Sequence, residues 1–233
     1  MIPLPNECLI KILSNFKSNY RCLFSCLLVN RNWCRIIVPF LWSEPTEYFN
    51  DKRLIRTYLL LLNVEEQTLL IPFEIIIPNY PKPLFEYTRY ATSVGIYLHD
   101  GVKNWLKEEG YGEERRNLIF NNDDYDDYDD HWPVNTVKCS LIALFLRTSK
   151  NLKILRFEGI IYDKKIFQYL YENTTITYLD FYTDNFDSRA LEILLEVLCR
   201  NTTLISLNLS YNELNTKGWK AIAKALCKNE EKQ

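Results

Sequence analysis

The chain of 233 residues carries 28 basic and 30 acidic side chains, so its net charge of −2 creates no long-range field that would attract nucleic acid or an anionic membrane. Its hydrophobic content of 47% supports one elongated domain or two small ones and excludes an intrinsically disordered protein. Because no apolar run reaches the roughly 18 residues of a membrane span and residues 1–5 do not resemble a signal peptide, we expect a cytoplasmic or nuclear protein without nucleic-acid or membrane partners.

Cysteine usage indicates a reducing compartment and gives no sign of a metal centre. The seven cysteines form an odd number without CxxC spacing, which favours neither a disulfide framework nor a zinc knuckle. Cys22 and Cys26 lie one helical turn apart and could share a metal, but His99 and His131 are distant in sequence, so we expect no metal and no cofactor. Asn-x-Ser/Thr sequons without a signal peptide are interpreted as turn and strand residues, at Asn173, Asn201 and Asn208.

The stretch LPNECLIKILSNF, from Leu4 to Phe16, predicts a helix that begins at Pro5. Proline suits the first helical position, and Glu7 places negative charge at the positive end of the helix dipole. Cys8 and Ile10 widen its apolar sector to an arc of about 200°, roughly twice what one core contact needs. The sector itself contains Leu9, Ile12, Leu13 and Phe16. Either the chain buries this helix on two sides, or another protein covers one of them.

Two further apolar segments follow within the first 45 residues. RCLFSCLLVN predicts a second helix, and RNWCRIIVPFLW predicts a third helix that Pro39 and Pro45 close. Three short helices in about 40 residues bury little surface, so a unit of this size needs support from a partner or from the rest of the chain.

The order and spacing of LPNECLIKILSNF, LLVNRNW and PFLW resemble an F-box, the adaptor-binding segment of substrate receptors in SCF-type ubiquitin ligases. The resemblance covers about 40 residues and implies a three-helix unit over residues 1–45 that binds a Skp-type adaptor, and through it a cullin scaffold. An adaptor contact would explain the wide apolar arc. The adaptor-binding residues that it implies are Leu4, Pro5, Leu9, Ile10, Leu13, Val29, Trp33 and Trp42.

Residues 46–135 are interpreted as a helical connector. LIRTYLLLLNVEEQTLL and GVKNWLKEE have helical patterns, while prolines interrupt the stretch between them. The acidic segment 121–131 holds six aspartates and almost no aliphatic residue, which favours a solvated loop, although a basic partner could dock there. It lacks the ligand spacing, the central glycine and the final glutamate of a calcium loop.

Residues 136–233 contain a repeat. Residues 174–201 align without a gap with residues 202–229, and a shorter unit precedes them. LISLNLSYNEL has the spacing of a leucine-rich repeat, and the unit length resembles the ribonuclease-inhibitor subtype. The predicted fold is therefore an α/β solenoid: an F-box, a helical connector and a short leucine-rich-repeat array with a parallel strand ladder. Only Asn212 keeps the turn asparagine of the repeat, since Asp184 and Ile160 occupy the equivalent places.

The two resemblances together imply a substrate receptor that contributes proximity rather than covalent chemistry. The target-binding residues implied on the concave strand face are Arg156, Glu158, Tyr178, Asp180, Tyr182, Ser206 and Asn208. An enzyme is disfavoured, because two isolated histidines and six glycines provide neither a nucleophile–base pair nor a phosphate loop. The alternative that remains is a non-catalytic repeat scaffold that binds the adaptor outside a ligase.

The last helix is expected to cap the repeat array with a charged outer surface. The strand edge from Leu207 to Ser210 would stay partly exposed, and the charged cover would consist of Lys220, Lys224, Lys228, Glu230, Glu231 and Lys232. The residues expected to face the preceding repeat are Trp219, Ile222, Ala223 and Leu226.

Overall fold

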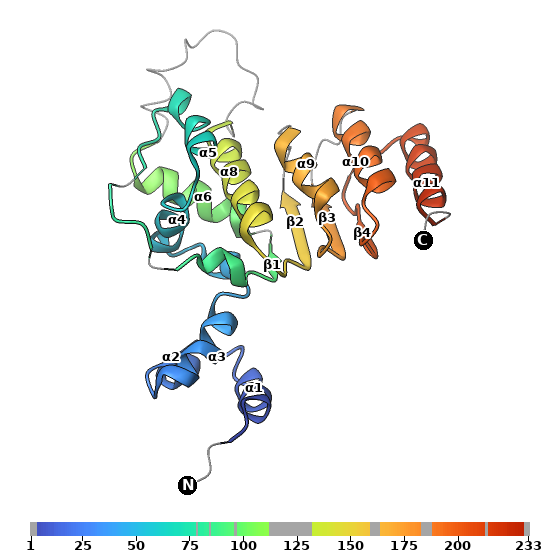
Figure 1. Cartoon of the computed structure of the whole chain (residues 1–233). Helices are drawn as coiled ribbons and strands as arrows, with labels where there is room; N and C mark the ends of the chain where they lie inside the picture. Colours follow the sequence, from blue (N-terminus) through green and yellow to red (C-terminus); the bar gives the residue numbers. More distant parts are fainter. Residues whose placement is uncertain are drawn as a thin grey trace.

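The chain is arranged as a small N-terminal helical unit, a helical connector and a row of strand–helix units (Figure 1). The computed structural model describes residues 4–77, 79–83, 85–95, 97–111, 132–158, 164–182, 188–212 and 214–230. The predicted acidic loop at 121–131 and the positions of Ile160 and Asp184 lie outside these residues. The N-terminus and the C-terminus lie at opposite ends of the molecule (Figure 1).

The N-terminal unit consists of helices α1 (Asn6–Ser14), α2 (Tyr20–Leu27) and α3 (Arg31–Leu41). Side chains of Asn19 and Asn30 cap the starts of α2 and α3 by accepting hydrogen bonds from backbone N–H groups. The unit has its own small core, formed by Leu9, Leu13, Leu23 and Ile37. The expectation that Pro39 closes the third helix is wrong: α3 continues to Leu41, and the Trp42 N–H still bonds the Val38 carbonyl.

The connector begins with the 3₁₀ helix η1 (Pro45–Tyr48) and helices α4 (Lys52–Leu59) and α5 (Val64–Thr68), and continues through η2 (Ile71–Phe73) and η3 (Tyr87–Tyr90) to α6 (Tyr97–Glu108). Residues 54–70, whose pattern predicts one helix, instead belong to the two helices α4 and α5. The division lies at Asn63, whose side chain accepts from the Glu66 N–H while the Glu66 carboxylate accepts from the Asn63 N–H. This capping box starts a new helix and so breaks the apolar run.

A parallel sheet of four strands in the order β1-β2-β3-β4 runs through the rest of the described chain. The strands are β1 (Ser93–Val94), β2 (Ile154–Glu158), β3 (Tyr178–Tyr182) and β4 (Ser206–Asn208). β1 was not expected, because it lies in the connector and has only two residues. Its pairing with Ile154 and Leu155 makes the connector the first strand of the sheet.

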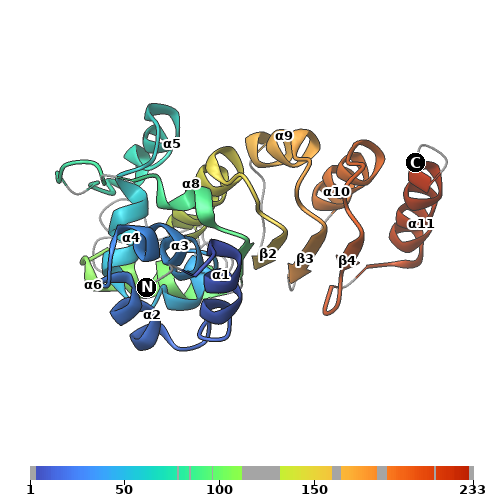
Figure 2. The ribbon, with the colours of Figure 1, turned by 60° about the horizontal axis from the view of Figure 1, so that its bottom comes forward.

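One face of the sheet is covered by helices α8 (Trp132–Thr148), α9 (Lys164–Glu172), α10 (Ser188–Arg200) and α11 (Thr216–Glu230), which follow one another in a row (Figure 2). Alternate strand residues such as Leu155, Phe157 and Leu179 point into the core beneath these helices. A single buried cluster continues from Phe49 in the connector to Ala225 in α11. α8 crosses the division expected at residue 136, and the division itself stays a prediction.

Asparagines at the start of two units stabilise the turns there, and Asn201 also joins its unit to the preceding one. Asn201, almost fully buried, donates to the carbonyls of Leu170 and Asn173, and its own carbonyl oxygen accepts from the N–H groups of Thr203 and Leu204. One unit earlier, the Asn173 side chain makes the same pair of acceptor bonds within its own turn. The interpretation of these two sequons as turn residues is therefore confirmed, and Asn208 lies in strand β4.

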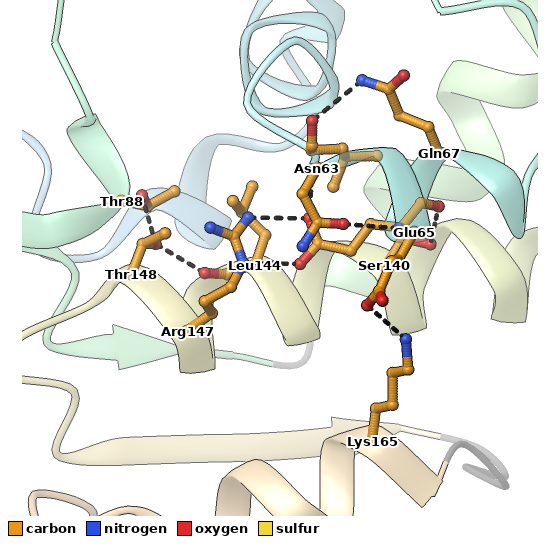
Figure 3. Close-up of polar contacts among 11 residues, drawn as sticks. Asn63, Glu65, Gln67, Thr88, Ser140, Leu144, Arg147, Thr148 and Lys165 are labelled. Carbon is orange, nitrogen blue, oxygen red and sulfur yellow. Dashed lines mark hydrogen bonds and ion pairs between the residues drawn. The ribbon is translucent and has the colours of Figure 1, made fainter.

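A polar seam fastens α5 of the connector to the helix row (Figure 3). Arg147 of α8 donates two hydrogen bonds of 3.0 Å to the Glu66 carboxylate, and Ser140 donates to the Glu66 carbonyl. Lys165 of α9 pairs with Glu65 at 2.6 Å. Although an acidic pair on a helix usually forms a solvated face, Glu66 is 5% exposed and is stabilised by a partner 81 residues away in sequence.

The last helix packs on a different face than expected. Gly218, Ile222 and Ala225 are buried against α10, whereas Trp219 is 47% and Leu226 is 40% exposed. Only Ile222 of the four expected packing residues is buried, and Ala223 is exposed as well. The expectation of a purely charged outer surface on this helix is therefore wrong.

Candidate functional site

The N-terminal unit exposes an apolar surface that is large for its size. From Leu4 onward, where the structure describes this unit, four side chains are buried in its core and seven large apolar side chains are exposed. The exposed residues are Leu4, Ile10, Ile12, Phe16, Phe24, Leu28 and Val29. Exposed apolar side chains in this number on a unit with so small a core indicate an interaction site.

The predicted adaptor-binding residues fall into three groups. Leu4, Pro5, Ile10 and Val29 are exposed and lie on this surface. Leu9 and Leu13 instead form the core of the unit itself, at 5% and 1% exposure, and Trp33 packs half-buried against that core. Trp42 lies apart from both groups, at the end of α3 where the unit meets the connector.

Four exposed apolar residues were not among the predicted contacts: Ile12, Phe16, Phe24 and Leu28. Ile12 was assigned to the same sector as Leu9 and Leu13, although it is 46% exposed. Phe24 and Leu28 are one turn apart on α2. Their i, i+4 spacing in the sequence was the signal that could have identified a second apolar stripe on this helix.

A joint made of hydrogen bonds connects the N-terminal unit to the sheet. The Ser43 carbonyl accepts from the Thr92 N–H at 2.7 Å, the Ser93 N–H at 3.2 Å and the Thr92 hydroxyl at 3.1 Å. The Thr46 hydroxyl, itself buried, accepts from the Gly95 N–H at 2.7 Å. These bonds tie the end of the N-terminal unit to the residues on both sides of strand β1.

Aromatic side chains fill the joint. Trp42 stacks on Tyr87 with ring centroids 4.0 Å apart and meets Tyr58 edge-on at 6.0 Å. A cavity of about 820 Å³ lies beside them between α2 and α4, with Tyr20 and Tyr48 in its lining. Burial, together with a hydrogen bond to Tyr48, raises the pKa of Tyr20, so its phenol stays neutral.

The uncovered face of the sheet carries the predicted target-binding residues in cross-strand rows. Arg156 is in register with Asp180 and Asn208, and its guanidinium lies 3.6 Å from the Asp180 carboxylate. The same guanidinium lies over the Tyr178 ring at 5.9 Å. Ser206 continues the row of Tyr178 on β4 and is exposed.

A second aromatic group lies beside these rows. Tyr182, in register with Glu158 on β2, is 41% exposed and contacts Tyr211 at a centroid distance of 5.5 Å. Tyr211 was not predicted; it has a φ of 65° in the turn after β4 and is 79% exposed. The backbone carbonyl of Glu158 accepts a hydrogen bond from the ammonium group of Lys138, which is buried. Burial lowers the pKa of this lysine.

Within the described part of the chain no group of three or more His, Cys, Asp or Glu side chains gathers as a metal site would require. Among the same residues, no helix has the length and apolar character that crossing a membrane would need. Asn212 performs the backbone role expected of it, since its side-chain amide donates to the Phe181 carbonyl at 2.7 Å.

Comparison with known families finds that the family described as F-box-like matches residues 2–47. No curated protein and no solved structure matches the chain. The matched residues contain α1, α2 and α3, together with the start of the joint. The N-terminal unit is therefore an F-box-like domain, and it is followed by an α/β region with a four-stranded parallel sheet.

Proposed function

We propose that this protein is the substrate-recognition subunit of an SCF-type ubiquitin ligase. The observation that carries the proposal is the exposed apolar surface of the F-box-like domain. Such a domain suggests binding to a Skp-type adaptor, which would link the chain to a cullin scaffold. The protein would act without chemistry of its own, by holding a target near a separately recruited conjugating enzyme.

The adaptor would cover the surface formed by Leu4, Ile10, Ile12, Phe24 and Val29. Each fully buried aliphatic side chain contributes about 1.5–3 kcal/mol to such an association before the cost of ordering. Leu9, Leu13 and Trp33 would support this surface from within, because they fix the positions of the three helices.

The target would bind the uncovered face of the strand–helix units, which we propose to be leucine-rich repeats. The chain offers polar and aromatic groups there: the Arg156–Asp180 pair with Tyr178, the exposed Ser206 and the neighbouring Asn208. Tyr182 is the best anchor, since exposed tyrosines provide a large contact area with a polar tip.

The joint between the F-box-like domain and the sheet supports a protein with two separate binding surfaces. Ubiquitin transfer requires the target to lie near the conjugating enzyme that the adaptor and cullin recruit. A flexible connection would lower the effective concentration of the target at that enzyme. Here the Ser43 carbonyl bonds the backbone at the first strand of the sheet, and Trp42 packs on Tyr87 and Tyr58 of the connector. The two proposed binding surfaces are therefore held on one rigid frame.

The test measures binding of a purified Skp-type adaptor by calorimetry to the intact chain, to Ile10→Asp and to Ile71→Asp. Both isoleucines are exposed, at 46% and 68%, but Ile71 lies in the connector and serves as the matched control. We expect Ile10→Asp to weaken binding at least about a hundredfold, because it places a carboxylate in an apolar contact. Ile71→Asp should bind as the intact chain does.

A second step distinguishes a ligase subunit from an adaptor-binding scaffold. The complex of chain and adaptor is mixed with a cullin and analysed by size-exclusion chromatography. Assembly of all three supports the ligase subunit, whereas a cullin that stays separate supports the scaffold. Unchanged adaptor affinity in a folded Ile10→Asp variant would contradict the proposal as a whole.

A further inference from the structure

The cavity between α2 and α4 has the size and the lining of a small-molecule site. Its volume of about 820 Å³ lies within the range of about 300–1,000 Å³ that such sites occupy. Nine of its thirteen lining residues are aromatic or aliphatic, and they come from α2, the end of α3, η1 and α4. The aromatic members are Tyr20, Phe24, Trp42, Tyr48 and Tyr58.

The cavity has a closed aromatic end and a polar mouth. Tyr58 of α4 is fully buried and therefore lies at the closed end, whereas the lining residues Asn50 and Lys52 are exposed and lie at the mouth. Aromatic side chains bind other rings by offset stacking or by edge-to-face contact. The lining therefore favours a flat and largely apolar occupant.

The Tyr58 hydroxyl is a buried polar group at this closed end. Among the residues that the structure describes, none forms a hydrogen bond with it. The ring is held in place, because Trp42, Phe49 and Phe145 surround it at centroid distances of 6.0, 5.6 and 5.1 Å. Since buried polar groups almost always have a partner, an unpartnered hydroxyl in the wall of a cavity indicates a ligand that supplies one.

The Tyr58 hydroxyl keeps its proton. Burial raises its pKa, and the neighbouring Tyr20 phenol raises it further, so the group stays neutral and can donate a hydrogen bond. Tyr20 itself is bonded to Tyr48, which leaves Tyr58 as the phenol that needs an acceptor.

The charges at the mouth are already paired. Lys52 lies 3.2 Å from Glu108, and Asp51 lies 2.6 Å from Arg53. These pairs include all three charged residues of the lining. A charged ligand that entered the aromatic end would lose its hydration without gaining an opposite charge. The lining therefore selects a neutral molecule.

We propose that this cavity binds a neutral, flat and mainly apolar small molecule whose carbonyl oxygen accepts a hydrogen bond from the Tyr58 hydroxyl. Because this hydroxyl is buried, a neighbour has to shift to admit the carbonyl. Tyr20 is half-buried and close enough to affect the pKa of Tyr58, so it is the side chain that would move. The inference depends neither on the adaptor nor on a ubiquitin-related role.

The test compares two probes of nearly equal shape on the full-length chain. One is 2-acetylnaphthalene, which has a carbonyl oxygen, and the other is 2-isopropenylnaphthalene, in which a methylene group replaces that oxygen. Dissociation constants are measured from the broadening of the probe resonances in NMR titrations. Tyr58→Phe should weaken binding of the ketone at least about fivefold and leave binding of the alkene unchanged. The different hydration of the two probes cancels in this comparison.

Three controls accompany these titrations. Tyr171→Phe removes a hydroxyl outside the cavity, so it should bind both probes as the intact chain does. Leu54→Trp fills the cavity from α4 and should weaken both probes at least about tenfold. The charged relative 2-naphthoate should bind the intact chain at least about tenfold more weakly than the ketone. Circular dichroism establishes that each variant is folded.

The proposal is overturned if the ketone does not bind up to its solubility limit, if Tyr58→Phe affects both probes alike, or if Leu54→Trp leaves binding unchanged. Naphthoate that binds as tightly as the ketone would contradict the neutral ligand. Displacement of the ketone by a purified Skp-type adaptor would assign the cavity to the adaptor contact and would overturn the proposal as well.

Discussion

Replacing Trp42 by alanine should loosen the F-box-like domain from the sheet without unfolding either part. Trp42 is half-buried and makes ring contacts with Tyr87 and Tyr58. Removing a fully buried tryptophan costs about 3–5 kcal/mol, and each aromatic pair contributes about 0.5–1.5 kcal/mol, so a loss of about 2–3 kcal/mol is expected here. That loss lowers the ratio of docked to undocked molecules about a hundredfold.

Single-molecule FRET between dyes on Cys8 and Cys227 measures this directly. Both cysteines are exposed, one in α1 and the other in α11, and the remaining five are replaced by serine or alanine. High dilution prevents association between copies. The Trp42→Ala chain should show a broad distribution of transfer efficiencies, whereas Tyr182→Ala, an aromatic truncation away from the joint, should keep the narrow one. An equally narrow distribution in Trp42→Ala would refute the view that this ring holds the joint.

Three further changes test the packing, the unit-to-unit bonds and a buried charge. Leu13→Asp should unfold the F-box-like domain, because a carboxylate enters a core of four side chains, while Ile10→Asp should change the free energy of unfolding by no more than about 0.5 kcal/mol; equal melting curves would contradict the core assignment. Asn201→Ala should cost about 2–4 kcal/mol in urea unfolding, since it removes the side-chain hydrogen bonds to Leu170, Asn173, Thr203 and Leu204 at a buried site, and a loss under about 1 kcal/mol would show that these bonds are dispensable. Burial lowers the pKa of Lys138 in the folded chain, so the unfolded chain binds its proton more readily and stability should rise as the pH approaches about 10.4; Lys138→Met should show less of this rise, and an identical pH profile would refute it.

The sequence predicted the three-helix unit because its apolar residues, caps and spacing all favour the same helices. It did not reveal which side of α1 faces inward. Cys8, Leu9, Ile10, Ile12 and Leu13 are all compatible with a wide arc, and only packing against α3 decides that Leu9 and Leu13 are buried and Ile12 is not. The width of the arc was informative, but its division between core and surface depends on contacts from outside the helix.

Strand β1 and the face of α11 were missed for related physical reasons. Ser93 and Val94 are too short a run to have an alternating pattern, and they become a strand only because β2 offers a partner. In α11 the repeat alignment identified the correct helix, but alignment alone treats Trp219 like its counterpart Leu191. Leu191 is covered by a following helix, and Trp219 is not covered by one among the described residues.

The seam between Glu66 and Arg147 sets the order in which the protein can fold during synthesis. The F-box-like domain closes its small core with contacts among residues 9–37, so these contacts can form before the connector is synthesised. The connector cannot, because Glu66 meets its partner 81 residues later. At about 5–20 residues per second, the side chains of the connector core wait roughly 4–16 s for α8 to emerge. During this interval an apolar segment is exposed beside a finished adaptor-binding domain, and early adaptor binding would protect only the domain.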